Sequence, residues 1–365
     1  MDQEFYKNGY RGLIKDNGIE EFCKLLIDKT LIFKYLTYLD LSDNIIDEEN
    51  IEKIDNLLHT FKFLNCNLTL LNLGGNNIDN NGVKLIAESL KNNKYLKILD
   101  LSGNRIGDEG FKYIAESLES LEELYLDDNY ITKDGIKYIE DIKNKSLVSL
   151  NLNNNEIGNG IKYIANCKLN LKILKLVNNE ISDEMEYITE FELFRKLIHL
   201  DLCHNNINKI TKLNCFQKLT YLNLGGNNIG ENGAKYIAES KGLKYLLNLR
   251  LYSCNIGDNG VKYIAEAREL KCLSSLDLRN NNITDAGFEF IFKLFSFYPL
   301  LDLNLGFSPK KYEIVLIEEI LNSNRMTIEK IKNERAEEKI YFAAIVHNLP
   351  WYLEFFEFFN NIWIL

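Results

Sequence analysis

The chain has 365 residues, of which 46% are hydrophobic, and its formal net charge is −10. A chain of this length and composition can bury a large core. The negative charge argues against nucleic acid as a partner, because that affinity depends on neutralising phosphates with lysine and arginine. The seven cysteines are dispersed without a CxxC pair, which favours reduced thiols in a cytoplasmic compartment.

Residues 1–30 are predicted to form an N-terminal cap. They contain no apolar signal core, so nothing in them indicates export by the general route. Residues 14–26 (IKDNGIEEFCKLL) match the second half of a pattern that recurs along the chain, with Cys23 at an alanine position. A cap of this kind would cover the first apolar strand.

The recurring pattern is clearest in residues 96–118 (LKILDLSGNRIGDEGFKYIAESL). Its first half, L-x-x-L-x-L-x-x-N-x-I, places Leu99 and Leu101 on one face of a short strand. Its second half opens with a glycine turn and then spaces apolar residues at the helical interval, with Asp108 as the expected N-cap. A unit this small cannot bury its own apolar face, so it must stack on copies of itself.

Ten to eleven copies of this unit follow one another between residues 31 and 308, and a degenerate last copy ends at Ser308. The side-chain amide of the pattern's asparagine can both donate and accept, so we expect it to satisfy turn groups that would otherwise be buried unpaired. This marker position, mostly 24 to 28 residues apart, is filled by Asn44, Asn76, Asn104, Asn129, Asn155, Asn179, Asn205, Asn227, Cys254 and Asn281.

This arrangement resembles the leucine-rich repeat family, and its helical half is similar to the ribonuclease-inhibitor-like class. The resemblance implies an α/β solenoid shaped as a horseshoe, with a parallel sheet on the concave side and helices on the convex side. Two departures are expected: a longer helix over residues 48–63, and a convex segment after Asn205 that is too short for a full helix.

Aromatic residues recur at one position of the helical halves. We expect their rings to pack between neighbouring helices, with the tyrosine hydroxyls at the water, rather than to form a second docking surface. These residues are Tyr113, Tyr138, Tyr163, Tyr187, Tyr236, Tyr263 and Phe290.

Residues 309–365 are predicted to form a C-terminal helical cap or tail. The final apolar run is shorter than the ~20 residues that a membrane-spanning helix needs, and it contains Glu354 and Glu357. Residues 348–359 (NLPWYLEFFEFF) are faintly similar to an F-box core, although Tyr352 stands where an acidic residue is usual. Whether the tail caps the solenoid or binds another protein is left open.

No phosphate-binding loop, GxSxG or HExxH motif occurs, so no catalytic residue and no cofactor are assigned, and we do not expect an enzyme. His199, Asp201 and Cys203 alternate onto one strand face and are all possible zinc ligands. The aspartate recurs in other repeats, for example as Asp100, with no histidine beside it. We therefore favour a polar patch over a metal site.

The variable strand positions predict a partner-binding face. Aromatic residues and arginines, which occur here among carboxylates, are enriched at protein interfaces. The carboxylates dominate the early repeats and the arginines appear only late, which suits a protein partner with a basic patch. The candidate residues are Tyr38, Asp40, Asp100, Glu123, Tyr125, Asp127, His199, Asp201, Tyr221, Arg250, Tyr252, Asp277 and Arg279.

The sequence therefore predicts a non-catalytic protein-interaction scaffold, in which charge reversal at Asp100 and Asp127 weakens partner binding and leaves thermal stability nearly unchanged. Two alternatives are kept. One is a substrate receptor that recruits a ubiquitin ligase through the F-box-like tail. The other is a GTPase-activating protein of the leucine-rich repeat type, although residues 333–365 are aromatic where that class has an acidic tail. Richness in Asn, Lys and Ile indicates an AT-rich genome and leaves room for a host-directed effector.

Overall fold

The computed structural model of the chain describes residues 36–63, 66–91, 93–117, 119–142, 144–182, 192–298, 300–305 and 322. The chain divides into two compact units, residues 1–187 and 188–365. The predicted caps, residues 1–30 and, apart from Asn322, residues 309–365, lie outside the described residues.

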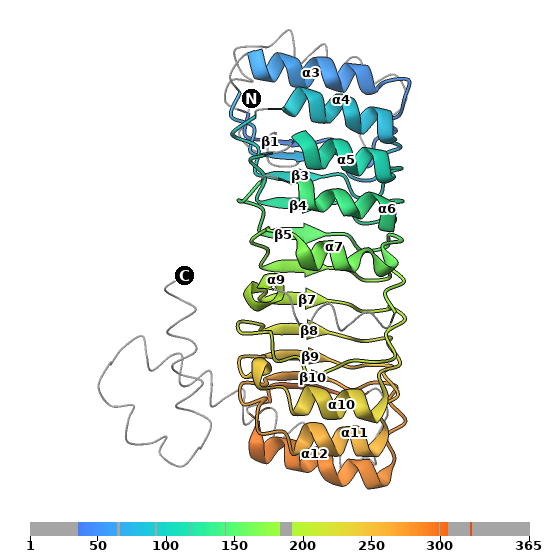
Figure 1. Ribbon diagram of the computed structural model, residues 1–365, viewed down its shortest axis with the longest axis vertical. Helices are drawn as coiled ribbons and strands as arrows, with labels where there is room; N and C mark the ends of the chain where they lie inside the picture. Colours follow the sequence, from blue (N-terminus) through green and yellow to red (C-terminus); the bar gives the residue numbers. More distant parts are fainter. Residues whose placement is uncertain are drawn as a thin grey trace, which may run out of the picture. The chain divides into compact units, whose positions relative to one another are not determined.

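In the first unit, three-residue strands alternate with helical segments, and each strand pairs in parallel with the next one in the sequence (Figure 1). The elements are β1 (Tyr38–Asp40), α3 (Ile51–Phe63), β2 (Leu70–Asn72), α4 (Asn80–Leu90), β3 (Ile98–Asp100), α5 (Asp108–Ser117), β4 (Glu123–Tyr125), α6 (Lys133–Ile136), η2 (Lys137–Asp141), β5 (Ser149–Asn151), η3 (Gly158–Gly160), α7 (Ile161–Asn166) and β6 (Ile173–Lys175).

The second unit repeats this plan, again with parallel strands paired in sequence order. Its elements are α9 (Glu192–Lys196), β7 (His199–Asp201), β8 (Tyr221–Asn223), α10 (Gly230–Ala238), η4 (Lys241–Leu243), β9 (Asn248–Arg250), α11 (Gly257–Ala265), β10 (Ser275–Asp277), α12 (Asp285–Phe297) and β11 (Asp302–Asn304). The predicted α/β repeat solenoid with parallel strands is confirmed.

The core of each repeat lies between its strand and its helix. In the repeat that contains β3 and α5, the strand leucines Leu99 and Leu101 are fully buried, and so are Ile106 in the turn and Phe111 in the helix. The residues on either side of Leu99 are partly exposed. This alternation, which β1 to β4 share, directs one face of the strand toward the helices and leaves the other face available.

The buried asparagines satisfy backbone groups of the turn, as predicted, and they also join successive repeats. The Nδ2 group of Asn104 donates to the carbonyls of Leu101 and Ser102 in its own turn, at 3.0 and 3.1 Å. It also donates to the carbonyl of Leu73 in the preceding repeat, at 3.0 Å, while its Oδ1 accepts from the N–H of Ile78 at 3.0 Å. One side chain thereby satisfies four backbone groups.

The helix starts are held partly by the preceding repeat. Asp108, expected as the N-cap of α5, lies within that helix, and its carboxylate instead accepts from the N–H and hydroxyl of Thr132 in the next repeat, at 2.8 and 2.9 Å. The first turn of α5 donates to Asn80 Oδ1, from the N–H groups of Gly107 and Gly110 at 2.8 and 3.0 Å. The expectation for Asp108 was wrong because the capping acceptor comes from one repeat earlier.

Both expected departures from the regular repeat are confirmed. Helix α3 is the longer helix predicted over residues 48–63. The segment from 206 to 220 contains no helix, and Leu213 and Phe216 fill its interior.

The aromatic residues on the helices pack against lysines. Lys84 lies 5.6 Å from the ring centroid of Tyr113 in the next repeat, and Lys112 lies 5.4 Å from that of Tyr138. The same relation recurs in the second unit between Lys235 and Tyr263, at 5.7 Å. These contacts support a packing role for Tyr113, Tyr138 and Tyr263, whereas Tyr236 is exposed. Tyr187 lies outside the described residues.

Candidate functional site

The predicted partner-binding residues lie on the strand face that points away from the helices. In β4, for example, Leu124 is buried while Glu123 and Tyr125 on either side are partly exposed. We call this surface the open face; it comprises the first and third residues of each strand and the residue two places further on. It carries Tyr38 to Asp127 of the predicted set in the first unit and His199 to Arg279 in the second.

An acidic cluster occupies the open face of β3 and β4. It consists of Asp100, Glu123 and Asp127 around Tyr125, which stands opposite Asp100 in the strand register. The hydroxyl of Tyr125 donates a 2.5 Å hydrogen bond to Glu123. Burial, this hydrogen bond and the surrounding negative charges raise the pKa of Tyr125 to about 12. The phenol therefore remains a protonated donor at neutral pH.

Asp127 shows the concentration of negative charge in this cluster. Its pKa is raised by burial and then by the charges of Asp100 and Asp128, while a backbone N–H and Lys175 act in the opposite direction. Its carboxylate accepts a 2.7 Å hydrogen bond from Asn151. Among the described residues, no carboxylate of the cluster forms an ion pair. A cation supplied from outside would relieve the mutual repulsion.

Tyr38 and Asp40 stand apart from this cluster. The hydroxyl of Tyr38 donates to Asp40 at 3.1 Å, and Asp40 also accepts from the N–H and hydroxyl of Ser42, at 3.0 and 2.7 Å. Strand β2, which presents Leu70 and Asn72, lies between β1 and β3. The structure therefore does not place Asp40 on a strand that neighbours the acidic cluster.

In the second unit, aromatic and cationic side chains stack across β7, β8 and β9. The imidazole of His199 lies parallel to the ring of Tyr221, with a centroid distance of 4.0 Å and an interplanar angle of 3°. The guanidinium carbon of Arg250 lies 5.4 Å from the centroid of the same ring. Burial, followed by the charge of Asp201, raises the pKa of Tyr221.

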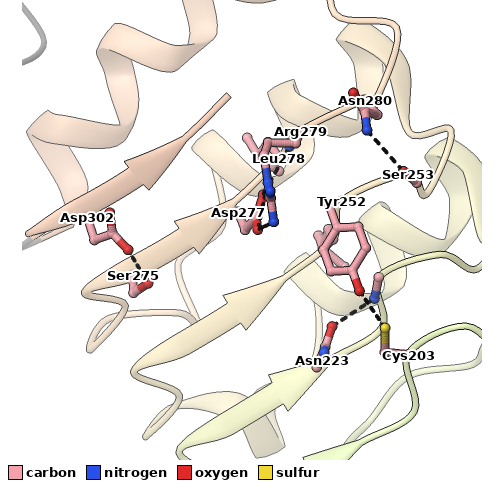
Figure 2. A network of polar contacts seen from close by, with 12 residues as sticks. Cys203, Asn223, Tyr252, Ser253, Ser275, Asp277, Leu278, Arg279, Asn280 and Asp302 are labelled. Carbon is pink, nitrogen blue, oxygen red and sulfur yellow. Dashed lines mark hydrogen bonds and ion pairs between the residues drawn. The ribbon is translucent and has the colours of Figure 1, made fainter. Parts of the chain in front are cut away.

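Tyr252 follows β9, and its phenol reaches toward Cys203 near the end of β7 (Figure 2). The Tyr252 hydroxyl forms a hydrogen bond with Cys203 Sγ and a 3.3 Å contact with Nε2 of His204. Gly225 allows this path, because a Cβ atom at this position would overlap the Tyr252 ring. Burial and the hydrogen bond to Cys203 raise the pKa of Tyr252.

Arg279 contacts Tyr252 of the preceding repeat and Asp277 of its own repeat. Its guanidinium lies over the ring of Tyr252, at 5.3 Å from the centroid. Its Nε and Nη2 donate to the two oxygens of Asp277, at 2.9 and 2.7 Å, and Figure 2 shows the two side chains together. Asp277 is buried. This fork therefore already holds a carboxylate.

The alternative metal site at His199, Asp201 and Cys203 has no support in the geometry. Asp201 accepts from the N–H of Cys203 at 3.1 Å and from the amide of Asn223 at 3.2 Å. The other two side chains contact the tyrosines described above. Within the described ranges, no group of three His, Cys, Asp or Glu side chains is placed to hold a metal ion.

The sequence pattern did not single out Asn151 and Asn223, whose amides hold Asp127 and Asp201. Both stand at the strand position of Asp100, so the register could have identified them. Their neutral side chains gave no reason to select them before the hydrogen bonds were known.

Comparison with known proteins gave a match to a family model and a match to a solved structure. The family model for the leucine-rich repeat matches residues 64–87, 92–115, 143–161, 217–238, 242–265 and 269–292. Among solved structures, the chain is similar to an internalin from Listeria monocytogenes, with a TM-score of 0.42 and 20% sequence identity, over 80% of this chain and 94% of that chain. The search of curated proteins found no match. In the part of the chain that the structure describes, no helix is long and apolar enough to span a membrane.

Proposed function

Since the chain is a leucine-rich repeat protein, we propose that it acts as a non-catalytic scaffold that binds a protein partner on the open face. The observation that carries this proposal is the acidic cluster, in which several carboxylates share a small area of sheet without a described ion pair. The hydrogen-bonded asparagines hold this surface in place, so a partner docks with little loss of conformational entropy.

The partner that fits the cluster carries a basic patch. Lysine or arginine side chains would find the carboxylates of Asp100, Glu123 and Asp127 within one stretch of sheet, with the Tyr125 ring beside them. Electrostatic complementarity of this kind sets specificity and speeds association, and it weakens as the salt concentration rises.

The test is affinity purification from eukaryotic cell lysate with the full-length chain and with an Asp100→Asn/Asp127→Asn double variant. Asparagine keeps an acceptor for Ser102 and for Asn151, so this change removes charge with less disturbance than charge reversal. We expect a basic partner to be captured by the wild-type chain and lost by the variant, with the thermal midpoint nearly unchanged.

The matched control is Glu116→Gln/Glu119→Gln, which removes the same charge from two exposed positions away from the open face. Equal capture by the wild-type and Asp100→Asn/Asp127→Asn chains would place binding elsewhere. If both double variants lost capture equally, binding would depend on the net charge of the chain and not on the acidic cluster.

The finer roles are proposals of the same kind. Cys66, Cys167, Cys203 and Cys254 are free thiols, which supports a reducing, cytoplasmic compartment, including that of a host cell for an effector. The ubiquitin-ligase alternative depends on residues 348–359, which lie outside the described residues. A chain ending at Lys310 separates the ubiquitin-ligase alternative from the scaffold. If that chain lost a captured ligase subunit but kept other partners, the result would favour a role for the tail.

An assay of GTP hydrolysis tests the GTPase-activating alternative, and we expect no stimulation.

A further inference from the structure

The second unit carries two arginines on its open face, and they differ in whether a carboxylate pairs with the guanidinium. Arg250 and Arg279 both lie over a tyrosine ring of the preceding repeat, at 5.4 and 5.3 Å from the ring centroid. The fork of Arg279 is occupied by Asp277. Arg250 is exposed, and within the described residues it forms no ion pair.

The position beside Arg250 explains why its charge is not neutralised. In the strand register, Asp201, Asn223 and Arg250 follow one another across β7, β8 and β9. The amide of Asn223 donates to Asp201 at 3.2 Å, and the N–H of Cys203 donates to the same carboxylate. Asp201 is thus held by neutral donors and lies two strands away from the arginine. On the other side, Asp277 of β10 stands opposite Arg250 in the register, but its two oxygens already accept from Arg279.

The guanidinium of Arg250 is also preorganised. It rests on Tyr221, which is itself stacked on His199 at 4.0 Å. A cation–π contact with the face of a ring uses none of the guanidinium N–H donors, so these donors stay available for a carboxylate in two-point geometry. Ordering a long arginine side chain normally costs conformational entropy on binding, and this platform lowers that cost.

We propose that Arg250 binds a carboxylate side chain, Asp or Glu, presented by a protein segment that docks on the open face of β8 and β9. The inference rests on the proposed function and adds to it: the second unit recognises an acidic group, whereas the acidic cluster of the first unit recognises basic ones. Arg279 takes no part in this recognition, because Asp277 already fills its fork.

The experiment uses the full-length chain and a displayed library of random twelve-residue peptides. Peptides are selected separately on wild-type protein, on Arg250→Gln and on the control Arg279→Gln. We expect enrichment of Asp or Glu at one peptide position with wild-type protein and with Arg279→Gln, and loss of that enrichment with Arg250→Gln. Affinity for the consensus peptide should fall about tenfold in Arg250→Gln. It should be partly retained in Arg250→Lys, which keeps the charge but not the fork.

Selection of acidic peptides that bind Arg250→Gln as tightly as wild type would overturn the inference. If the peptides selected on wild-type protein were basic and did not bind Asp100→Asn/Asp127→Asn, the inference would be overturned and the proposed function would stand. Selection of no peptide at all would count against both. A consensus peptide that binds at least tenfold more tightly when its acidic residue is replaced by phosphoserine would replace the carboxylate by a phosphate as the preferred group. Dimerisation of the wild-type chain that is lost in Arg250→Gln would replace the partner by a second copy.

Discussion

At the scale of single residues, the buried asparagine links sequence to stability most directly. Replacing Asn104 by alanine removes three donated hydrogen bonds and the acceptor of the Ile78 N–H at once. Buried backbone groups left without partners cost ~1–3 kcal/mol each, although relaxation and water recover part of this. We expect Asn104→Ala to lower the free energy of unfolding by about 3 kcal/mol, measured by urea denaturation.

The control for this change is Asn166→Ala, at an exposed position with one 3.3 Å hydrogen bond to Glu140. Its effect should stay within about 0.5 kcal/mol. Similar losses in the two variants would contradict the role given to the buried amide. Cys254 shows a weaker form of the same device, since its thiol donates to the carbonyl of Leu224 at 3.1 Å.

A second residue-scale prediction concerns Cys167, whose pKa is raised by burial from about 9 to about 11. Below pH 9 the thiol is protonated in both the folded and the unfolded chain. Between pH 9 and 11 the unfolded thiol ionises first, so the free energy of unfolding falls as the pH rises. From pH 8.5 to 10.5 we expect Cys167→Ala to lose about 2 kcal/mol less than wild type. Parallel pH profiles of the two proteins would refute this assignment.

At the scale of elements, neighbouring residues cap helices in different repeats. Asp79 accepts from the N–H of Gly82 in its own helix α4, at 2.9 Å. Asn80, the next residue, accepts from Gly107 and Gly110 at the start of α5. Each cap contributes about 1 kcal/mol, which corresponds to a roughly fivefold change in amide exchange by local opening.

Amide hydrogen exchange can separate these two caps. We expect Asp79→Ala to speed exchange at Gly82 and leave Gly110 unchanged, and Asn80→Ala to do the reverse. Each variant serves as the control of the other. Faster exchange at the start of α4 in both would mean that Asn80 supports its own helix rather than that of the next repeat.

The predictable part of these elements is the part set by periodicity within one repeat. The strand leucines, the buried asparagines and the lack of a full helix after Asn205 followed from spacing alone. The residue that caps α5 could not be predicted from spacing, because it belongs to the preceding repeat. Gly110 is explained in the same way: a side chain there would come within 2.7 Å of Asn80 Oδ1, so the glycine admits the cap of the preceding repeat.

At the scale of the whole molecule, the sequence predicted which side chains lie on the open face but not the state of each charge on it. Alternation placed the predicted side chains on the open face. It could not distinguish Arg250 from Arg279, because the distinction depends on which carboxylate each fork reaches. It also could not show that Asn223 rather than an arginine holds Asp201. Such pairings depend on side-chain conformations across neighbouring strands.

The repeat architecture also determines how far a local defect spreads. The hydrogen bonds that tie Leu99 and its strand to other elements run to β2 and β4, the strands on either side. Truncating a fully buried leucine costs ~2–5 kcal/mol, and in a chain of nearest-neighbour contacts that loss is felt locally first. We expect Leu99→Ala to speed amide exchange most in peptides covering β2 to β4, and least in those covering β9 and β10. The matched variant Leu249→Ala, in the buried centre of β9, should reverse this order. A uniform increase across both units in either variant would instead mean that the chain opens only as a whole, because coupling between repeats exceeds the stability of any one of them.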